Sequence, residues 1–139
     1  MTSHPPLQDT ARAGPYRLPP DREAGLLASA ASLGLQHLIY RPEGNQDIRT
    51  WLAGLGQTLG FPEHFGANFD ALYDCLTDTE ILPQPGLLLI LGGLTSLGDA
   101  VDILIAIFQA ASDEWRDHER PLWVLFDAPN LDLDPLPKA

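Results

Sequence analysis

The chain lacks the features that mark secreted, membrane-spanning or disulfide-stabilised proteins. Its one cysteine, Cys75, excludes an internal disulfide and favours a reducing compartment. The first residues, "MTSHPPLQDTARAG", contain no apolar stretch of the kind found in a secretion signal. No apolar run, "GLLLILGGL" included, is long enough to span a bilayer. We therefore expect a cytoplasmic protein.

Basic residues are also scarce, and the net charge is −11. No Lys or Arg occurs between Arg49 and Arg116, an interval rich in Asp and Glu. An acidic surface attracts neither nucleic acid nor anionic membranes, so we expect neither as a partner. Two interpretations of the acids remain open: a surface kept for solubility, or a negative field that steers a cationic partner.

Catalytic and cofactor motifs are missing as well. There is no Gly-rich phosphate loop and no familiar Ser/His/Asp order. The four histidines are scattered, which argues against a metal site. We expect no cofactor, no metal and no catalytic residue. The composition, 45% hydrophobic over 139 residues, is that of one globular domain.

Strand and helix patterns alternate along the chain, which predicts an α/β domain with a small parallel sheet. The apolar runs 86–93 and 121–128 predict strands covered on both faces, so Leu87, Leu89, Val124 and Phe126 should lie in adjacent parallel strands. Residues 35–40 predict another strand, and "PYRLP" a short extended segment. Helices are expected at 21–33 with Asp21 as N-cap, after Asp47 to about Gly60, from Asn68 to Thr77, and at 97–116.

The helix expected at 69–78 divides its residues between two faces. At 100° per residue, Phe69, Leu72 and Leu76 gather on one side and should be core residues. Asp70, Asp74 and Thr77 gather on the other side, with Asp78 at the edge of that group and Tyr73 at the border.

Each of these polar residues also has an ordinary explanation. Asp70 lies in the first turn, where an acid stabilises the helix dipole. Asp74 can be a solvated surface residue, Cys75 a small buried hydrophobe and His64 a loop residue. Against this, like charges spaced i, i+4 cost a helix about 0.2–0.5 kcal/mol, and a lysine at either position would remove that cost.

The stretch "FPEHFGANFDALYDCLTD" (61–78) resembles the signature of the barstar family, intracellular inhibitors of a secreted bacterial ribonuclease. The order of elements agrees over residues 35–128. The resemblance implies a three-stranded parallel sheet flanked by helices, and a stoichiometric inhibitor rather than an enzyme. Together with the Pro-rich, polar first residues and the irregular last ones, it predicts a flexible tail (1–14), an N-terminal extension with a short strand or extended segment and a helix (15–34), a barstar-like domain (35–128) and an irregular tail (129–139).

By position, the resemblance makes Asp74 the central carboxylate that enters a ribonuclease active site and Asp70 a second contact. Thr77 matches a contacting threonine. The sequence departs from the family at other contact positions: His64 replaces a tyrosine, Tyr73 a tryptophan, and Asp78 a glycine. Ala110 stands near the position of a contacting glutamate, for which Asp78, Glu80, Asp113 or Glu114 could substitute.

Three functions remain open on these grounds. The first is an inhibitor or immunity protein for a basic, extracellular-type ribonuclease or a ribonuclease toxin. The second is a barstar-like binding module for another cationic protein. The third is a small enzyme that uses Asp70, Asp74 and His64 in acid–base chemistry.

Overall fold

A four-stranded, all-parallel sheet forms the centre of the molecule, in the order β1-β4-β3-β2. The computed structural model describes residues 6–62, 65–78 and 85–136. Leu89 pairs with Val124 and Leu91 with Phe126, which confirms that the two apolar runs form adjacent parallel strands. The strands are β1 (Pro15–Arg17), β2 (Gln36–Tyr40), β3 (Leu87–Leu91) and β4 (Leu122–Phe126).

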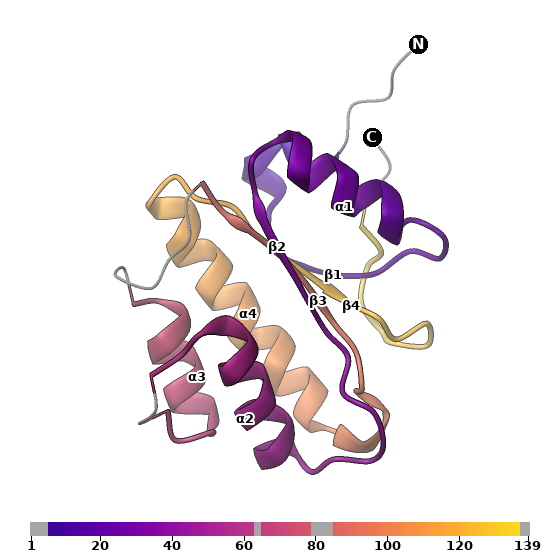
Figure 1. The fold of residues 1–139 in the computed structure, drawn as a ribbon, viewed down its shortest axis with the longest axis vertical. Coiled ribbons are helices and arrows are strands. Elements are labelled where there is room, and N and C mark those ends of the chain that lie inside the picture. The colour runs from indigo at the N-terminus through magenta and orange to yellow at the C-terminus, as the bar shows by residue number, and fades with distance from the viewer. Residues whose placement is uncertain (1–5, 63–64, 79–84, 137–139) are drawn as a thin grey trace.

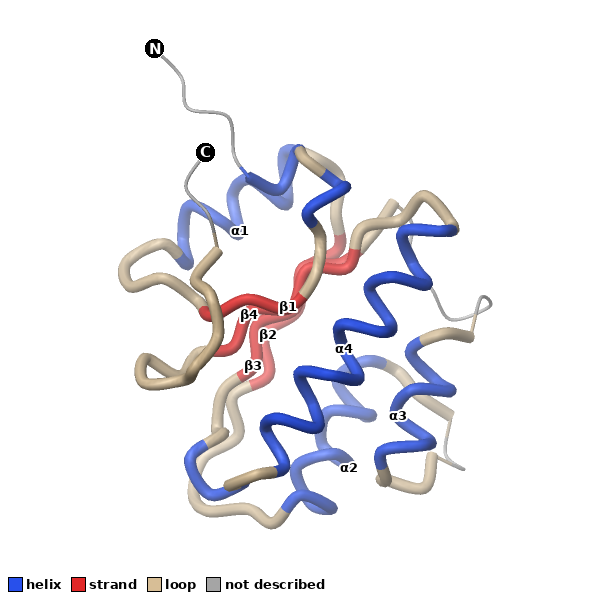
Figure 2. Tube along the Cα trace, turned by 180° about the vertical axis from the view of Figure 1, so that it is seen from behind, coloured by secondary structure: helices blue, strands red, loops and turns tan. Residues whose placement is uncertain are grey.

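Helices cover both faces of the sheet. The first helix, α1, lies on one face, and the other three lie together on the opposite face (Figure 1). The view from behind shows the same two layers (Figure 2). The helices are α1 (Glu23–Ser32), α2 (Ile48–Leu59), α3 (Phe69–Leu76) and α4 (Ala100–Asp117), with short 3-10 turns at Pro6–Gln8, Thr10–Arg12 and Thr95–Leu97.

Alternate side chains of the central strands enter two separate cores. Leu89 and Val124 pack toward α2, α3 and α4. Leu88 and Trp123 pack on the other face with Leu26 of α1. Every residue of β3 and β4 is therefore buried, which explains why their sequences are apolar without alternation.

The ends of α2 are set by local sequence, as predicted. The Asp47 carboxylate accepts a hydrogen bond from the Thr50 amide at 2.8 Å, which caps the helix and lowers the pKa of Asp47. Gly60 ends the helix with φ 76°, a left-handed conformation that glycine adopts without steric cost.

Two predictions about the sheet and the first helix were wrong. The sheet has four strands instead of three, because Pro15–Arg17 of the N-terminal extension pairs with β4. Asp21 does not cap α1: Arg22 occupies the N-cap position without a side-chain bond, and Asp21 has φ 61°. A residue with that φ is outside the extended conformation from which a side chain normally caps.

Two glycines of α2 allow other segments to approach closely. The Tyr40 hydroxyl donates to the Trp51 carbonyl at 2.7 Å and fills the space beside Gly54. A Cβ on Gly56 would lie 2.5 Å from Cδ2 of Phe65. Phe65 belongs to the loop that leads into α3, so the missing side chain at position 56 lets this loop pack directly against α2.

Candidate partner-binding site

Both ends of α3 are held in place. At the start, the Asn68 side chain accepts a hydrogen bond from the Ala71 amide at 2.8 Å, which confirms the predicted cap. At the end, the Trp115 indole of α4 donates to the Leu76 carbonyl at 2.6 Å. That carbonyl has no partner within its own helix, so Trp115 satisfies a group that would otherwise be buried without a bond.

The buried side of α3 anchors it to the core. Leu72 is 0% and Leu76 is 3% exposed, as predicted. Phe69 was also expected to be a core residue, but it is only half-buried and packs against the edge of this cluster. It is the first residue of the helix, where fewer neighbouring side chains surround it.

The opposite side forms what we call the acidic face: Asp70, Tyr73, Asp74 and Thr77. Both aspartates are exposed. Tyr73 lies at the border between this side and the buried side, and the residue is 36% exposed. Thr77 is half-buried, and its hydroxyl donates to the Tyr73 carbonyl at 2.8 Å, which leaves the oxygen lone pairs available.

The two carboxylates of this face are unneutralised. Within the described part of the chain, neither Asp70 nor Asp74 has a hydrogen-bond or ion-pair partner. The ion pairs of that part join Arg41 to Glu23 and Asp127, and Arg116 to Asp113. The charges of α3 therefore face solvent on a rigid support, which is an arrangement suited to a cationic partner.

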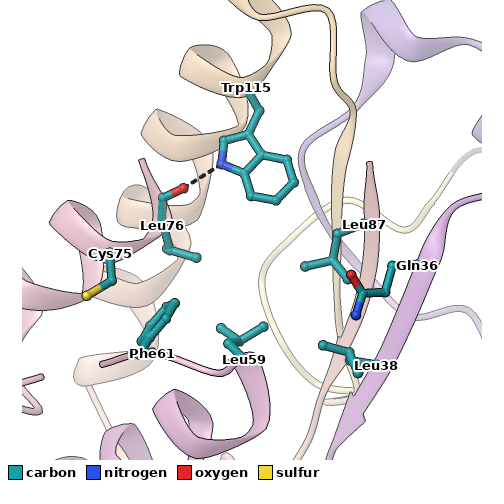
Figure 3. Close-up of a pocket in the computed structure, with 8 residues that line it drawn as sticks. All are labelled: Gln36, Leu38, Leu59, Phe61, Cys75, Leu76, Leu87 and Trp115. Carbon is teal, nitrogen blue, oxygen red and sulfur yellow. Dashed lines mark hydrogen bonds between the residues drawn. The ribbon is translucent and has the colours of Figure 1, made fainter. Parts of the chain in front are cut away.

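Cys75 lies behind the acidic face and is not equipped as a nucleophile. Burial raises the pKa of its thiol, and the charges of Asp74 and Asp78 raise it further. The side chain borders an apolar cavity of about 50 Å³ together with Phe61, Leu76 and Trp115 (Figure 3). That volume is far below the several hundred Å³ of small-molecule sites, so we interpret the cavity as a packing gap beneath α3.

The remaining residues singled out from the sequence are placed as follows. Asp78 is exposed just after α3, and Ala110 is exposed on α4. His64 and Glu80 lie outside the described residues. Asp113 accepts hydrogen bonds from Arg116 and Gln109, on the flank of α4 where Arg116 also bonds the Ala13 carbonyl.

No sequence signal identified the supports of the site, Trp115 and Phe65, as such. The sequence placed Trp115 only within the helix expected at 97–116, and its bond to Leu76 joins elements far apart in sequence. The described residues contain no group of three His, Cys, Asp or Glu side chains that could hold a metal ion. None of the helices in that part of the chain combines the length and the apolar character of a membrane span.

Comparison with known proteins gives the family. The sequence model described as barstar, the barnase inhibitor, matches residues 40–127, and the chain belongs to this family. A protein of Bacillus subtilis (strain 168) named "Putative ribonuclease inhibitor YrdF" is 39% identical over 67 residues, which cover 45% of this chain and 70% of that protein. The resemblance drawn from the sequence is thereby confirmed.

Proposed function

We propose that this protein is a stoichiometric inhibitor of a basic ribonuclease and that it blocks the enzyme's active site with the acidic face of α3. The observation that carries the proposal is the pair of exposed, unneutralised carboxylates, Asp70 and Asp74, on a helix fixed at both ends. Family membership and the name of the Bacillus relative support the same function. The enzyme would be a secreted ribonuclease or a ribonuclease toxin, held inactive in the cytoplasm.

The chemistry of the target explains why carboxylates suit this task. A ribonuclease binds the phosphates of RNA with cationic side chains. A carboxylate presents two oxygens with a similar charge and geometry, and it can accept paired hydrogen bonds from an arginine. Because the Asn68 cap and the Trp115 bond already hold α3, little conformational freedom is lost on binding.

The two carboxylates have unequal roles in this proposal. Asp74 lies in the middle of the exposed side, next to Tyr73, whose ring can exclude water from a central contact. Asp70 lies in the first turn, where the helix dipole already stabilises its charge. We place Thr77, His64 and Asp78 at the margin of the same contact, with His64 assigned from the sequence resemblance alone.

The test is a titration of ribonuclease activity. Purified basic ribonucleases are assayed with increasing amounts of the protein, and the proposal predicts a linear loss of activity that ends at one chain per enzyme for the true target. The variant Asp70→Asn/Asp74→Asn should lose this inhibition. The control Asp102→Asn/Asp117→Asn removes two exposed charges from α4 and should inhibit as wild type does.

Inhibition by the Asp70→Asn/Asp74→Asn variant at wild-type strength would overturn the proposed mechanism. Failure to inhibit any basic ribonuclease, combined with salt-sensitive capture of a basic protein that is no nuclease, would favour a binding module for that protein instead.

A further inference from the structure

The two edges of the sheet differ in how the chain covers them. At the β1 edge, the Arg17 amide donates to the Asp134 carbonyl at 2.8 Å, and the Leu136 amide donates to the Arg17 carbonyl at 3.1 Å. The C-terminal segment therefore pairs with β1 and closes that edge. At the β2 edge, no described segment pairs with the strand, and β2 lies in front of the other strands in Figure 1. An open edge presents unpaired amides and carbonyls to another strand.

The register shows which groups β2 presents. The Gln36 amide donates to the Gly86 carbonyl at 3.0 Å, and the Gly92 amide donates to the Tyr40 carbonyl at 2.8 Å. In a parallel ladder the bonding direction alternates by residue, so positions 36, 38 and 40 face β3. The amides and carbonyls of His37 and Ile39 consequently point out of the edge. Their side chains are exposed, Ile39 by 42%.

The chain segment that forms this edge carries no charge of its own. No Asp, Glu, Lys or Arg occurs between Glu23 and Arg41, a range that includes most of α1 and all of β2. The exposed side of α1 consists of small uncharged residues, whereas a solvated helix usually carries charged side chains there. We call this surface, residues 24–40, the uncharged edge. The exposed residues of α1 within it are Ala24, Gly25, Ala28, Ala31 and Ser32.

The net charge of the molecule bears on which face a second copy of the chain could use. With a net charge of −11, two copies that meet through the α3 side bring carboxylates together, which is unfavourable. At the uncharged edge no carboxylate of residues 24–40 faces the other copy, so only the longer-range repulsion between the net charges remains, which salt screens. The edge is also complementary to itself, because each copy offers one outward donor and one outward acceptor at both His37 and Ile39.

We propose that two copies of this chain pair through the uncharged edge, with their β2 strands antiparallel about a two-fold axis near Leu38. A two-fold axis reverses the strand direction, so the pairing is antiparallel although each sheet is parallel. His37 then lies opposite Ile39 of the partner subunit, and each such pair exchanges two backbone hydrogen bonds. The result is one sheet that runs through both copies.

The first experiment measures the mass of the full-length chain by sedimentation equilibrium over a range of concentrations. The proposal predicts a reversible transition from one chain of 15.2 kDa to twice that mass. Ile39→Lys places a charged side chain on the edge, which blocks strand pairing in natural sheets, and should raise the dimer Kd by about tenfold or more. Circular dichroism and a thermal melt verify that the variant is folded.

Ile103→Lys is the matched control. Ile103 of α4 is 44% exposed against 42% for Ile39, and both variants change the net charge equally. The control should dimerise as wild type does. A wild-type chain that stays monomeric at the highest concentration overturns the proposal, and so does a dimer that survives Ile39→Lys but dissociates in Ile103→Lys.

Hydrogen exchange on the wild-type protein provides a second measurement that needs no variant. The amides of His37 and Ile39 should exchange more slowly as concentration rises through the dimer Kd, because they enter hydrogen bonds only in the dimer. Unchanged exchange at both amides in a sample shown to be dimeric would place the interface elsewhere and contradict the proposal.

Discussion

The acidic face and the uncharged edge, the two contact surfaces that we propose, have opposite charge patterns on one strongly acidic protein. The acidic face lies on α3 within an interval without a single Lys or Arg. The uncharged edge lies on α1 and β2 within an interval without any Asp, Glu, Lys or Arg. The first surface has charges that nothing in the described chain neutralises, and the second has no charge to neutralise.

The difference shows that the distribution of charge is more informative than the total. An evenly acidic surface would serve solubility alone. Here two acids of α3 face solvent in an interval without Lys or Arg, and acids are missing from residues 24–40, where we propose that two identical chains meet. The two surfaces should therefore respond differently to mutation, to salt and to neighbouring charge.

The largest expected effect comes from removing the support of the acidic face. Leu72→Ala leaves a gap under α3, where the side chain is 0% exposed, and should lower the free energy of unfolding by about 2–5 kcal/mol. Chemical denaturation measures this. Because Leu72 does not line the uncharged edge, the dimer Kd of the folded variant should stay unchanged. A stability loss below about 0.5 kcal/mol would show that this side of α3 is not packed.

A pair of glycine variants compares the supports of the two surfaces. Gly56→Ala forces Phe65 to move, since the new Cβ would lie 2.5 Å from its ring, and should cost about 1–3 kcal/mol by overpacking. Gly25→Ala, in α1, meets no atom within 4 Å and should instead stabilise the protein by about 0.5–1 kcal/mol through helix propensity. Thermal melts measure both. Equal signs for the two substitutions would contradict the close approach at Gly56.

Partner binding and dimerisation should depend differently on salt. Association of the acidic face with a cationic partner should slow by about tenfold between low and high salt, because screening weakens the attraction that guides encounter. Dimerisation through the uncharged edge should not weaken over the same range, because no charge pair drives it and salt screens the repulsion between two chains of net charge −11. Stopped-flow mixing and sedimentation measure the two processes. A partner on-rate that ignores salt would argue against steering.

The smallest expected effect concerns Cys75, which reports on the field behind the acidic face. Burial, Asp74 and Asp78 raise the pKa of its thiol, so less thiolate is present at a given pH and alkylation should be slower than for an unfolded thiol. Asp74→Asn removes one of these charges, lowers the thiol pKa and should speed alkylation by less than about tenfold. Asp102→Asn, on α4, should leave the rate unchanged; an equal increase there would indicate a general loosening of the fold.

The elements that could be predicted are those determined by residues close together in the sequence. The Asn68 side chain caps the start of α3 by accepting a hydrogen bond from the Ala71 amide. The spacing of Leu72 and Leu76 identifies the buried side of the helix. The runs that became β3 and β4 are apolar because both of their faces are covered. The exposure of Asp70 and Asp74 could likewise be predicted from helical spacing alone, because they lie opposite the buried leucines.

The features that could not be predicted depend on segments distant in sequence. β1 is a strand because β4 and residues 134–136 pair with it, and its three residues contain no periodic pattern. Gly56 is required by the Phe65 ring, a tertiary contact, although helix propensity alone identifies it as a defect. The uncharged edge did have a signal, the missing charges between Glu23 and Arg41, but its meaning depends on β2 lying at an open edge of the sheet.

The central claim is that the acidic face binds the partner and that Asp74 contributes most. The most direct measurement is a calorimetric titration of the partner ribonuclease with Asp74→Ala, beside a thermal melt of the same variant and the control Asp102→Ala. Removing a carboxylate that is buried against cations on binding typically costs about 2–5 kcal/mol, a range known from charge pairs in such complexes, barnase–barstar among them. We predict that Asp74→Ala melts like wild type and loses affinity by this amount, while Asp102→Ala binds normally. Binding of Asp74→Ala within about threefold of wild type, under roughly 0.7 kcal/mol, would contradict the account, because the acids of α3 would then be an ordinary solvated surface.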